Sequence, residues 1–173
     1  YQQLLERIDH LDPHQKYIQE FNDKKAVLEA LGYLEGSELT AAGLFASQIH
    51  GHELMITEMF MEGLFHSFSP AELNAIMVSI GYEPRKNETR LKHGLELGPI
   101  HRLWHFLAKM EQRMLGYSTV QFNDHVAALA YRWSRGTAFS DLLADSQVDE
   151  GDLVFTFRRG IDLLRQVRNA TTE

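Results

Sequence analysis

Arginine and aromatic side chains near the C-terminus are the residues whose types and spacing best suit contact with a polyanion. They lie in or directly after the stretch DEGDLVFTFRRGIDLLRQV, which covers residues 149–167. A guanidinium can bind a phosphate through two parallel hydrogen bonds, and an aromatic ring can stack on a base. The stretch therefore predicts recognition of nucleic acid rather than catalysis. The side chains concerned are Phe155, Arg158, Arg159, Arg165 and Arg168.

This stretch is predicted to form a helix, although Val-Phe-Thr-Phe alternates as a strand would. A strand would have to stop at Arg158, whereas helical spacing continues to the end of the stretch. Acidic residues stand at its start and arginines near its end, as the helix macrodipole favours. Phe155 is expected to point outward. The predicted apolar stripe consists of Val154, Phe157, Ile161, Leu164 and Val167.

The two adjacent arginines are expected to differ. Asp162 lies at the i,i+4 spacing of a helical ion pair from Arg158 and can hold it. Arg159 has no acid of its own at pairing distance and is the predicted nucleic-acid contact. Gly160 costs a helix roughly 1 kcal/mol relative to alanine. A close approach by a backbone or a ligand, or tight helix packing, would explain its presence.

Histidine clusters invite a metal hypothesis, which the sequence disfavours. His101 and His105 have the i,i+4 spacing of zinc ligands on a helix, but Arg102 occupies the place where the zincin motif has Glu. The HGHE cluster at 50–53 stands between two helices and suits helix capping. We therefore predict no metal site and no catalytic residue in this chain.

Other charged sets have structural explanations of their own. Glu58 and Glu62 are expected to share the solvent face of a helix or to meet arginines of neighbouring helices. The basic loop at 85–92 is either a solvated face or a second nucleic-acid contact. Motifs that cradle phosphates or bind dinucleotides are missing from the sequence, so the chain by itself should not hydrolyse ATP.

The composition is that of a globular protein whose overall charge opposes nucleic-acid binding. The chain has 173 residues, 44% of them hydrophobic, and a net charge of −7, so a nucleic-acid contact needs a local basic patch. It has no cysteine, which predicts a reducing, cytoplasmic setting. It has no apolar run long enough for a membrane span. Because it begins with Tyr1, we expect it to be part of a longer protein.

Helical spacing in almost every segment predicts an all-α, multi-helix bundle. GYLEGSELT is the exception and predicts one small β-hairpin near residues 32–40. We expect a winged-helix-like N-terminal part at 1–50 and a helical bundle at 51–173, packed together as one domain. Reading of duplex DNA is disfavoured, because HQKYIQEFNDKKAVLEA lacks an arginine-rich face. The expected helices cover about 2–11, 13–31, 41–50, 52–65, 70–80, 99–115, 122–134, 138–144 and 150–169, with N-caps at Asp12 and Thr40 and the longest loop at 82–98.

Three segments, in this order, resemble the DSHCT domain, the C-terminal helical domain of superkiller-type and exosome-associated DExH-box RNA helicases and their bacterial relatives. The segments are LGYLEGSELTAAGLFASQIHGHELMITEMFMEGLF, SPAELNAIMVSIGYEPRK and WSRGTAFSDLLADSQVDEGDLVFTFRRGIDLLRQVRNA. The resemblance covers nearly the whole chain. The third segment resembles the closing pattern of the family, in which Trp133 and Phe139 are interpreted as core residues.

The resemblance implies a non-catalytic accessory domain at the exit of a helicase core. Its closing helix would face single-stranded RNA and support 3′-to-5′ movement along it. In such domains the second basic residue of the pair, here Arg159, and a residue one turn later, here Leu163, contact the strand. This chain has Phe155 where relatives often carry a basic residue, so stacking on its ring could replace a polar contact. The candidate contacts are Phe155, Arg158, Arg159, Leu163, Arg165 and Gln166.

The partners that the resemblance implies are the helicase core of the same parent chain, single-stranded RNA or else DNA, and the RNA-degradation machinery, with no membrane. No cofactor is expected in this domain, whereas the parent core would bind ATP and Mg²⁺. The alternative is a structural or protein-interaction domain whose arginines pair internally, and a DNA regulator ranks last. Exposure of Arg159 beside Phe155 would favour RNA contact, and burial against Glu53 or Glu58 would argue against it.

Overall fold

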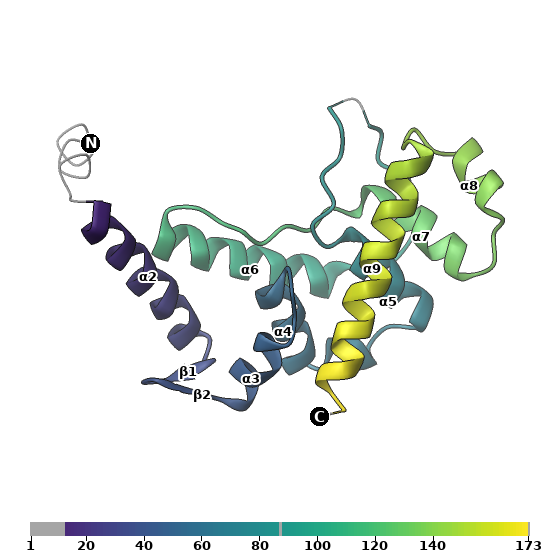
Figure 1. Ribbon diagram of the computed structural model, residues 1–173. Coiled ribbons are helices and arrows are strands. Elements are labelled where there is room, and N and C mark those ends of the chain that lie inside the picture. The colour runs from purple at the N-terminus through teal and green to yellow at the C-terminus, as the bar shows by residue number, and fades with distance from the viewer. Residues whose placement is uncertain (1–12, 87, 173) are drawn as a thin grey trace.

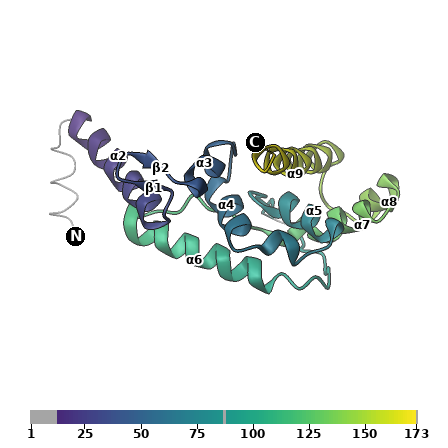
Figure 2. The ribbon, with the colours of Figure 1, turned by 90° about the horizontal axis from the view of Figure 1, so that it is seen from below.

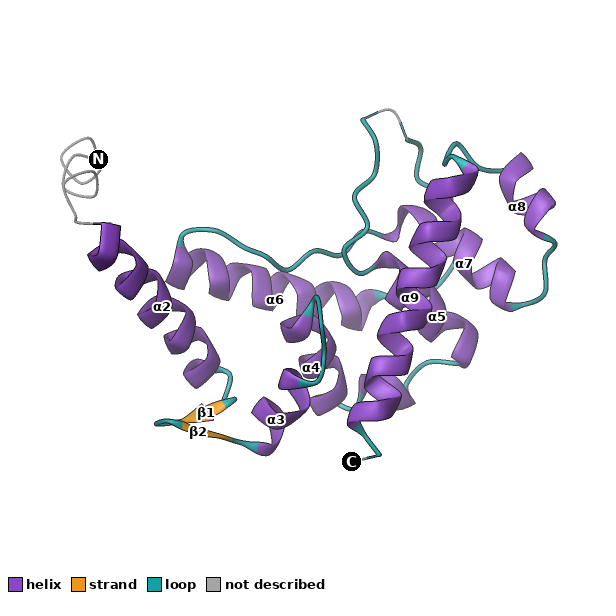
Figure 3. Ribbon diagram, viewed as in Figure 1, coloured by secondary structure: helices purple, strands orange, loops and turns teal. Residues whose placement is uncertain are grey.

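The protein is an all-α bundle with one small β-hairpin, as the sequence predicts (Figures 1 and 3). A computed structural model describes residues 13–86 and 88–172. The expected helix at 2–11 and its neighbour Asp12 lie outside the described residues. The elements, with 3₁₀ turns marked η, are α2 (Pro13–Ala30), β1 (Leu34–Glu35), β2 (Glu38–Leu39), α3 (Ala41–Ser47), α4 (Glu53–Met61), η1 (Leu64–His66), α5 (Pro70–Ser79), α6 (Gly98–Leu115), η2 (Asp124–Val126), α7 (Ala127–Ser134), α8 (Phe139–Ala144) and α9 (Glu150–Ala170).

Local hydrogen bonds begin the helices where the sequence indicates. The Thr40 side chain accepts a hydrogen bond of 3.1 Å from the backbone N–H of Gly43 and caps α3, which confirms the predicted N-cap. At α5, Ser69 and Glu72 form a reciprocal capping box, with Pro70 at the first helical position. Each cap satisfies backbone N–H groups that lack a partner inside the helix.

The predicted hairpin is present and follows α2 directly. Its antiparallel strands pair Leu34 with Leu39 and Glu35 with Glu38. Gly36 begins the turn with a φ of 67°, a left-handed conformation that glycine adopts without steric cost. The hairpin leads into α3, which packs on α4, while α2 and α4 both pack on α6. The proposed division near residue 50 stays a prediction.

Helix α5 forms the centre of the core. Its residues from Asn74 to Ser79 are all buried, and so is Ile80 directly after it, so the second half of this helix is enclosed on every side. Helices α7 and α9 make the most extensive contacts with it. Trp133 of α7 stacks on Phe157 of α9 with ring centroids 4.8 Å apart, and Phe139 meets the same ring edge-on at 6.5 Å. Both aromatics pack against the core, as the sequence interpretation requires.

The buried face of α9 differs from the predicted apolar stripe. It consists of Leu153, Phe157, Gly160, Leu163 and Val167. Phe157 and Val167 are confirmed, but Val154 is 40% exposed and its predicted inward position is wrong. The line of closest contact between α9 and α5 passes through Gly160. Because glycine has no side chain, it does not appear in a pattern of apolar residues. A Cβ on Gly160 would lie 2.5 Å from Cγ2 and 3.0 Å from the backbone N of Val78 in α5.

The polar segment between α5 and α6 is tied to the bundle by charged side chains. Asp124 of η2 is 5% exposed and accepts from Arg90 and from Nε2 of His93, the latter at 3.1 Å. Nε2 of His101 lies 3.4 Å from the same carboxylate oxygen. Burial on its own would raise the pKa of Asp124, but the His93 hydrogen bond and the charges of Arg90 and the histidines outweigh it and lower that pKa.

None of the helices within residues 13–86 and 88–172 is long and apolar enough to cross a bilayer.

The substitution Gly160→Ala is expected to lower the free energy of unfolding by about 1–3 kcal/mol, because the added methyl group must push α9 away from α5. This loss should occur despite the higher helix propensity of alanine. Gly151→Ala in the same helix is the control: nothing lies within 4 Å of its Cβ position, so stability should stay equal or rise by up to about 1 kcal/mol. Denaturant unfolding measures both. Equal effects of the two substitutions would contradict the packing role of Gly160.

The pKa of Asp124 predicts a dependence of stability on pH. Because the folded-state pKa lies below the unfolded value of about 3.9, the stabilisation is complete above that value and is lost as the pH falls through the folded-state pKa. Asp124→Asn should cost about 1–3 kcal/mol near neutral pH, and the difference from wild type should shrink under acid conditions. Asp145→Asn, which breaks the exposed pair with Arg132, should cost less than about 1 kcal/mol.

Candidate nucleic-acid interface

The outer face of α9 is an exposed surface that combines an aromatic ring with arginines. Phe155 is 67% exposed, which confirms its predicted outward direction. Arg158 and Arg165 follow it along the same face, at helical spacings, and both are exposed. Together with Val154 and Ile161 they line a shallow open hollow on the surface. Arg159 also lines this hollow, which therefore contains four of the six candidate contacts.

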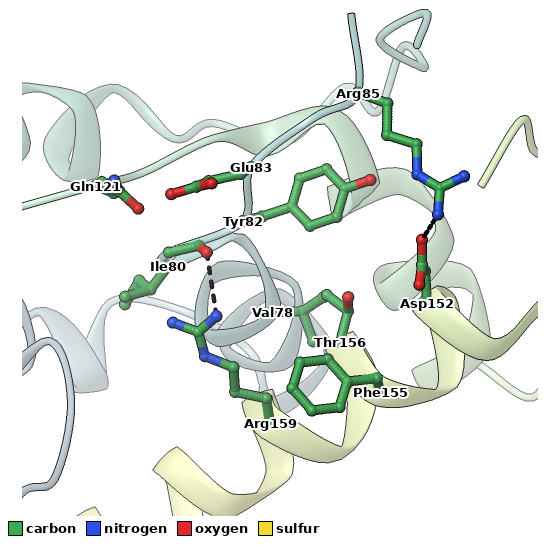
Figure 4. Close-up of a pocket in the computed structure, with 11 residues that line it drawn as sticks. Val78, Ile80, Tyr82, Glu83, Arg85, Gln121, Asp152, Phe155, Thr156 and Arg159 are labelled. Atoms are coloured by element: carbon green, nitrogen blue, oxygen red, sulfur yellow. Dashed lines mark hydrogen bonds and ion pairs between the residues drawn. The ribbon is translucent and has the colours of Figure 1, made fainter. Parts of the chain in front are cut away.

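Arg159 does not lie on this face as an unpaired cation. Its side chain is half-buried, and one guanidinium N–H donates a hydrogen bond of 3.2 Å to the backbone carbonyl of Gly81 (Figure 4). A second N–H donates to Nε2 of His52. The prediction that Arg159 has no partner is therefore wrong. Its partners stand 78 and 107 residues earlier in the chain, beyond what spacing within one helix can reveal.

The contact with Arg159 requires a neutral imidazole on His52. Burial of the ring lowers the pKa of His52, the nearby Arg159 charge lowers it further, and Glu53 opposes both effects. A neutral imidazole has one nitrogen that can accept, which the guanidinium occupies. Gly81 has a φ of +67°, and a Cβ there would collide with the His52 ring and the Arg159 guanidinium. The three residues therefore pack together at one point beside α9.

Of the two adjacent arginines, Arg158 is the one without an ion-pair partner among the described residues. Among the residues that the structure describes, no carboxylate lies within 4.0 Å of its guanidinium, so the predicted pair with Asp162 is wrong. The Asp162 carboxylate accepts instead from the Gln166 amide at 2.8 Å. Gln166 in turn accepts from the backbone N–H of His50 at 2.6 Å and joins α9 to the segment between α3 and α4. The sequence thus assigned the two arginines in reverse.

Besides Arg159, two more of the six candidate contacts are engaged with the rest of the fold. Leu163 is 3% exposed and belongs to the core between α9 and α5, so it cannot touch a strand on the outer face. Gln166 is occupied by the two hydrogen bonds that join it to His50 and Asp162. The remaining surface of α9 consists of Phe155, Arg158 and Arg165, with Arg159 behind it.

A pocket of about 370 Å³ lies on the other side of Phe155. Figure 4 shows its walls: Phe155 and Arg159 from α9, Tyr82 and Glu83 from the segment after α5, and Gln121. Arg159 therefore lies beside Phe155 in a hollow, as the RNA hypothesis expects, but it is half-buried against His52 rather than exposed. Neither Glu53 nor Glu58 is its partner.

The basic loop contributes fewer unpaired charges than its sequence suggests. Arg85 bridges Asp149 and Asp152 at the start of α9, and Arg90 bonds Asp124. These pairs fasten the loop to the bundle. Lys86 and Lys92 are exposed. The loop is therefore better explained as a tether than as a second nucleic-acid contact.

The histidine and glutamate clusters also have structural partners. No group of three metal-ligating side chains was found within residues 13–86 and 88–172. Glu53 accepts from the backbone N–H of Gly51 at 2.8 Å, in the first turn of α4, as predicted. Glu58 is half-buried, so burial raises its pKa, and it accepts from the Tyr33 hydroxyl at 2.7 Å rather than meeting an arginine. The sequence offered no signal for this tyrosine contact.

Comparison with known proteins agrees with the geometry. The chain is 28% identical over 163 residues to "mRNA transport homolog 4" of Caenorhabditis elegans, which covers 89% of the chain and 16% of that protein. It is 26% identical over 164 residues to "Exosome RNA helicase MTR4" of Homo sapiens, which covers 88% of the chain and 16% of the relative. "Superkiller complex protein 2" of Homo sapiens is 25% identical over 182 residues, or 98% of the chain and 14% of the relative.

The chain thus spans only about one sixth to one seventh of the length of these relatives, whose names refer to mRNA transport, an exosome RNA helicase and a superkiller complex. A protein-family model, the DSHCT (NUC185) domain, matches residues 36–173. This match extends over most of the chain and ends with α9, the helix that carries the exposed arginines. The chain belongs to the DSHCT (NUC185) domain family.

Proposed function

We propose that this chain is a non-catalytic accessory domain of an ATP-dependent RNA helicase and contacts single-stranded RNA through the outer face of α9. Its membership of the DSHCT family and its similarity to proteins named as RNA helicases support the helicase context. ATP and Mg²⁺ would be bound by the helicase core of the parent protein. The RNA-degradation machinery is the proposed setting, because relatives carry exosome and superkiller names.

The observation that carries the proposal is an exposed aromatic ring in line with arginines that have no ion-pair partner among the described residues. Phe155, Arg158 and Arg165 span ten helical positions, or about 15 Å along the axis. A base can stack on Phe155 while the guanidinium groups of Arg158 and Arg165 bind phosphates of the nucleotides that follow along the strand. Such contacts do not read sequence, which suits a domain that a strand must slide past. The few phosphates involved imply weak, salt-sensitive binding.

Arg159 has a positioning role in this proposal. Its hydrogen bonds to Gly81 and His52 join α9 to the segment after α5 and to the start of α4. They fix the rotation of α9 about its own axis, and therefore the direction in which Phe155 and Arg158 point. Arg158, rather than Arg159, makes the direct RNA contact in this proposal.

A structural or protein-interaction role remains the second candidate, and one observation favours it. Tyr17 and Phe21 lie at i,i+4 spacing on α2 and are 71% and 66% exposed. Aromatic side chains are enriched at the centres of protein interfaces. This surface is far in sequence from α9, so the two functions do not exclude each other.

In the intact helicase, the triple substitution F155A/R158Q/R165Q is expected to weaken single-stranded RNA binding at least about tenfold, because one stacking platform and two phosphate contacts are lost. Unwinding should slow, while RNA-independent ATP turnover should stay near wild type. The control K24Q/K25Q removes the same charge from lysines already paired with Glu20 and Glu29, and should change little. Wild-type unwinding by the triple variant would exclude the proposed contact.

A second comparison separates the two adjacent arginines. Arg159→Ala should lower the free energy of unfolding by about 1–3 kcal/mol, because the Gly81 carbonyl and the His52 imidazole lose their donor. Arg158→Ala should leave stability within about 0.5 kcal/mol, because the exposed side chain has no ion-pair partner among the described residues. Chemical denaturation measures both values. A stability loss of equal size in the two variants would refute the distinct roles.

A further inference from the structure

Helix α6 carries a second row of basic side chains. Arg102, Phe106, Lys109 and Arg113 follow one another at spacings of four, three and four residues, which places them in one line along a helix. All four side chains are exposed, and Phe106 is 57% exposed. His105 and Gln112 lie exposed beside this row. We call the four residues the α6 row.

The charges of the α6 row are not neutralised within the described part of the chain. No ion pair within 4.0 Å there includes Arg102, Lys109 or Arg113. The acid of α6 is Glu111, which is 2% exposed and points away from the row. Its carboxylate accepts hydrogen bonds from the Ser118 hydroxyl and from the backbone N–H groups of Thr119 and Val120. The row is therefore a local excess of positive charge on a chain whose net charge is −7.

The neighbouring helix α2 shows how an ordinary solvated face differs. Lys24 pairs with Glu20 at 2.8 Å and Lys25 with Glu29 at 3.4 Å, so its cations alternate with acids. A helix face that serves only solubility has no need to exclude acids. The α6 row excludes them and places an aromatic ring between its cations.

The α6 row is separate from the α9 surface. In Figure 2, α6 and α9 lie at opposite sides of the molecule, with α4 and α5 between them. A strand in contact with Phe155 and Arg158 therefore cannot touch the α6 row at the same point of its length. Whatever binds there is a different segment or a different molecule.

We propose that the α6 row is a second RNA-binding surface, which holds a single-stranded segment outside the path along α9. Arg102 and Arg113 are eleven positions apart, or about 16 Å, which corresponds to roughly five nucleotides at 3.4 Å each. Phosphates would bind the three cations, and a base would stack on Phe106. An acidic protein surface would meet the same charges, but the aromatic ring between the cations and the helicase context favour RNA. That choice rests on the proposed function.

The test is a salt titration of RNA binding by the intact helicase, with an oligouridine of about 30 nucleotides. The variant R102Q/K109Q/R113Q should reduce the slope of log K against log salt concentration by about 2, since each lost phosphate contact contributes about 0.7 for a single strand. Affinity at low salt should fall at least about tenfold. Phe106→Ala should weaken binding by about fivefold or more while leaving the slope unchanged.

Two further variants make the result specific. K16Q/K24Q/K25Q removes the same total charge from α2 and should keep the wild-type slope. R102K/K109R/R113K retains the charge of the α6 row and should also keep the wild-type slope. A changed slope in this variant would show that substitution at these positions disturbs the fold. A wild-type slope in R102Q/K109Q/R113Q overturns the proposal. The same holds if this variant keeps the wild-type slope for RNA but loses binding to polyglutamate, which stands for an acidic protein surface.

The α9 variant F155A/R158Q/R165Q in the same titration separates the two surfaces. If the α9 variant binds RNA as wild type does while the α6 variant reduces the slope of log K against log salt concentration, the function proposed for α9 fails and the α6 row stands. If only the α9 variant lowers the slope, the α6 row fails and the proposed function stands.

Discussion

The close approach of α9 to α5 at Gly160 is the constraint on which the rest of the structure depends. Because Val78 occupies the space that a side chain at position 160 would need, α9 can approach α5 this closely only in the rotation that turns Gly160 toward Val78. That rotation turns Phe157 onto Trp133 and Leu163 into the core. It leaves Phe155 and Arg158 outside. The surface of α9 is thus a consequence of a contact on its opposite face.

Electrostatic pairing then decides which cations remain available to a partner. Arg85 and Arg90 fasten the segment after α5 to the start of α9 and to η2, and Arg159 is held by a carbonyl and a neutral imidazole. These charges stabilise the fold and are poor candidates for binding. The exposed arginines of α9 and the cations of α6 have no such partners in the described part of the chain. A strongly acidic chain can therefore still present local positive surfaces.

The two surfaces share one arrangement of side chains. Both join arginine or lysine to an exposed aromatic ring, which is a sequence-independent way to hold single-stranded nucleic acid. Their positions at opposite sides of the bundle would let one domain contact two segments of the same RNA.

The sequence by itself determined the helices of the described residues, the hairpin, the cap at Thr40 and the family, because periodicity, turn residues and local motifs depend on neighbours along the chain. It also predicted α9 as the helix that contacts nucleic acid, and this stays a prediction. Only the tertiary structure decided the rotation of that helix, since glycine is silent in an apolar pattern although it marks the closest contact. Only the fold could reverse the roles of Arg158 and Arg159. The partners of Arg159 come from distant segments, and no local spacing can report a hydrogen bond that folding creates.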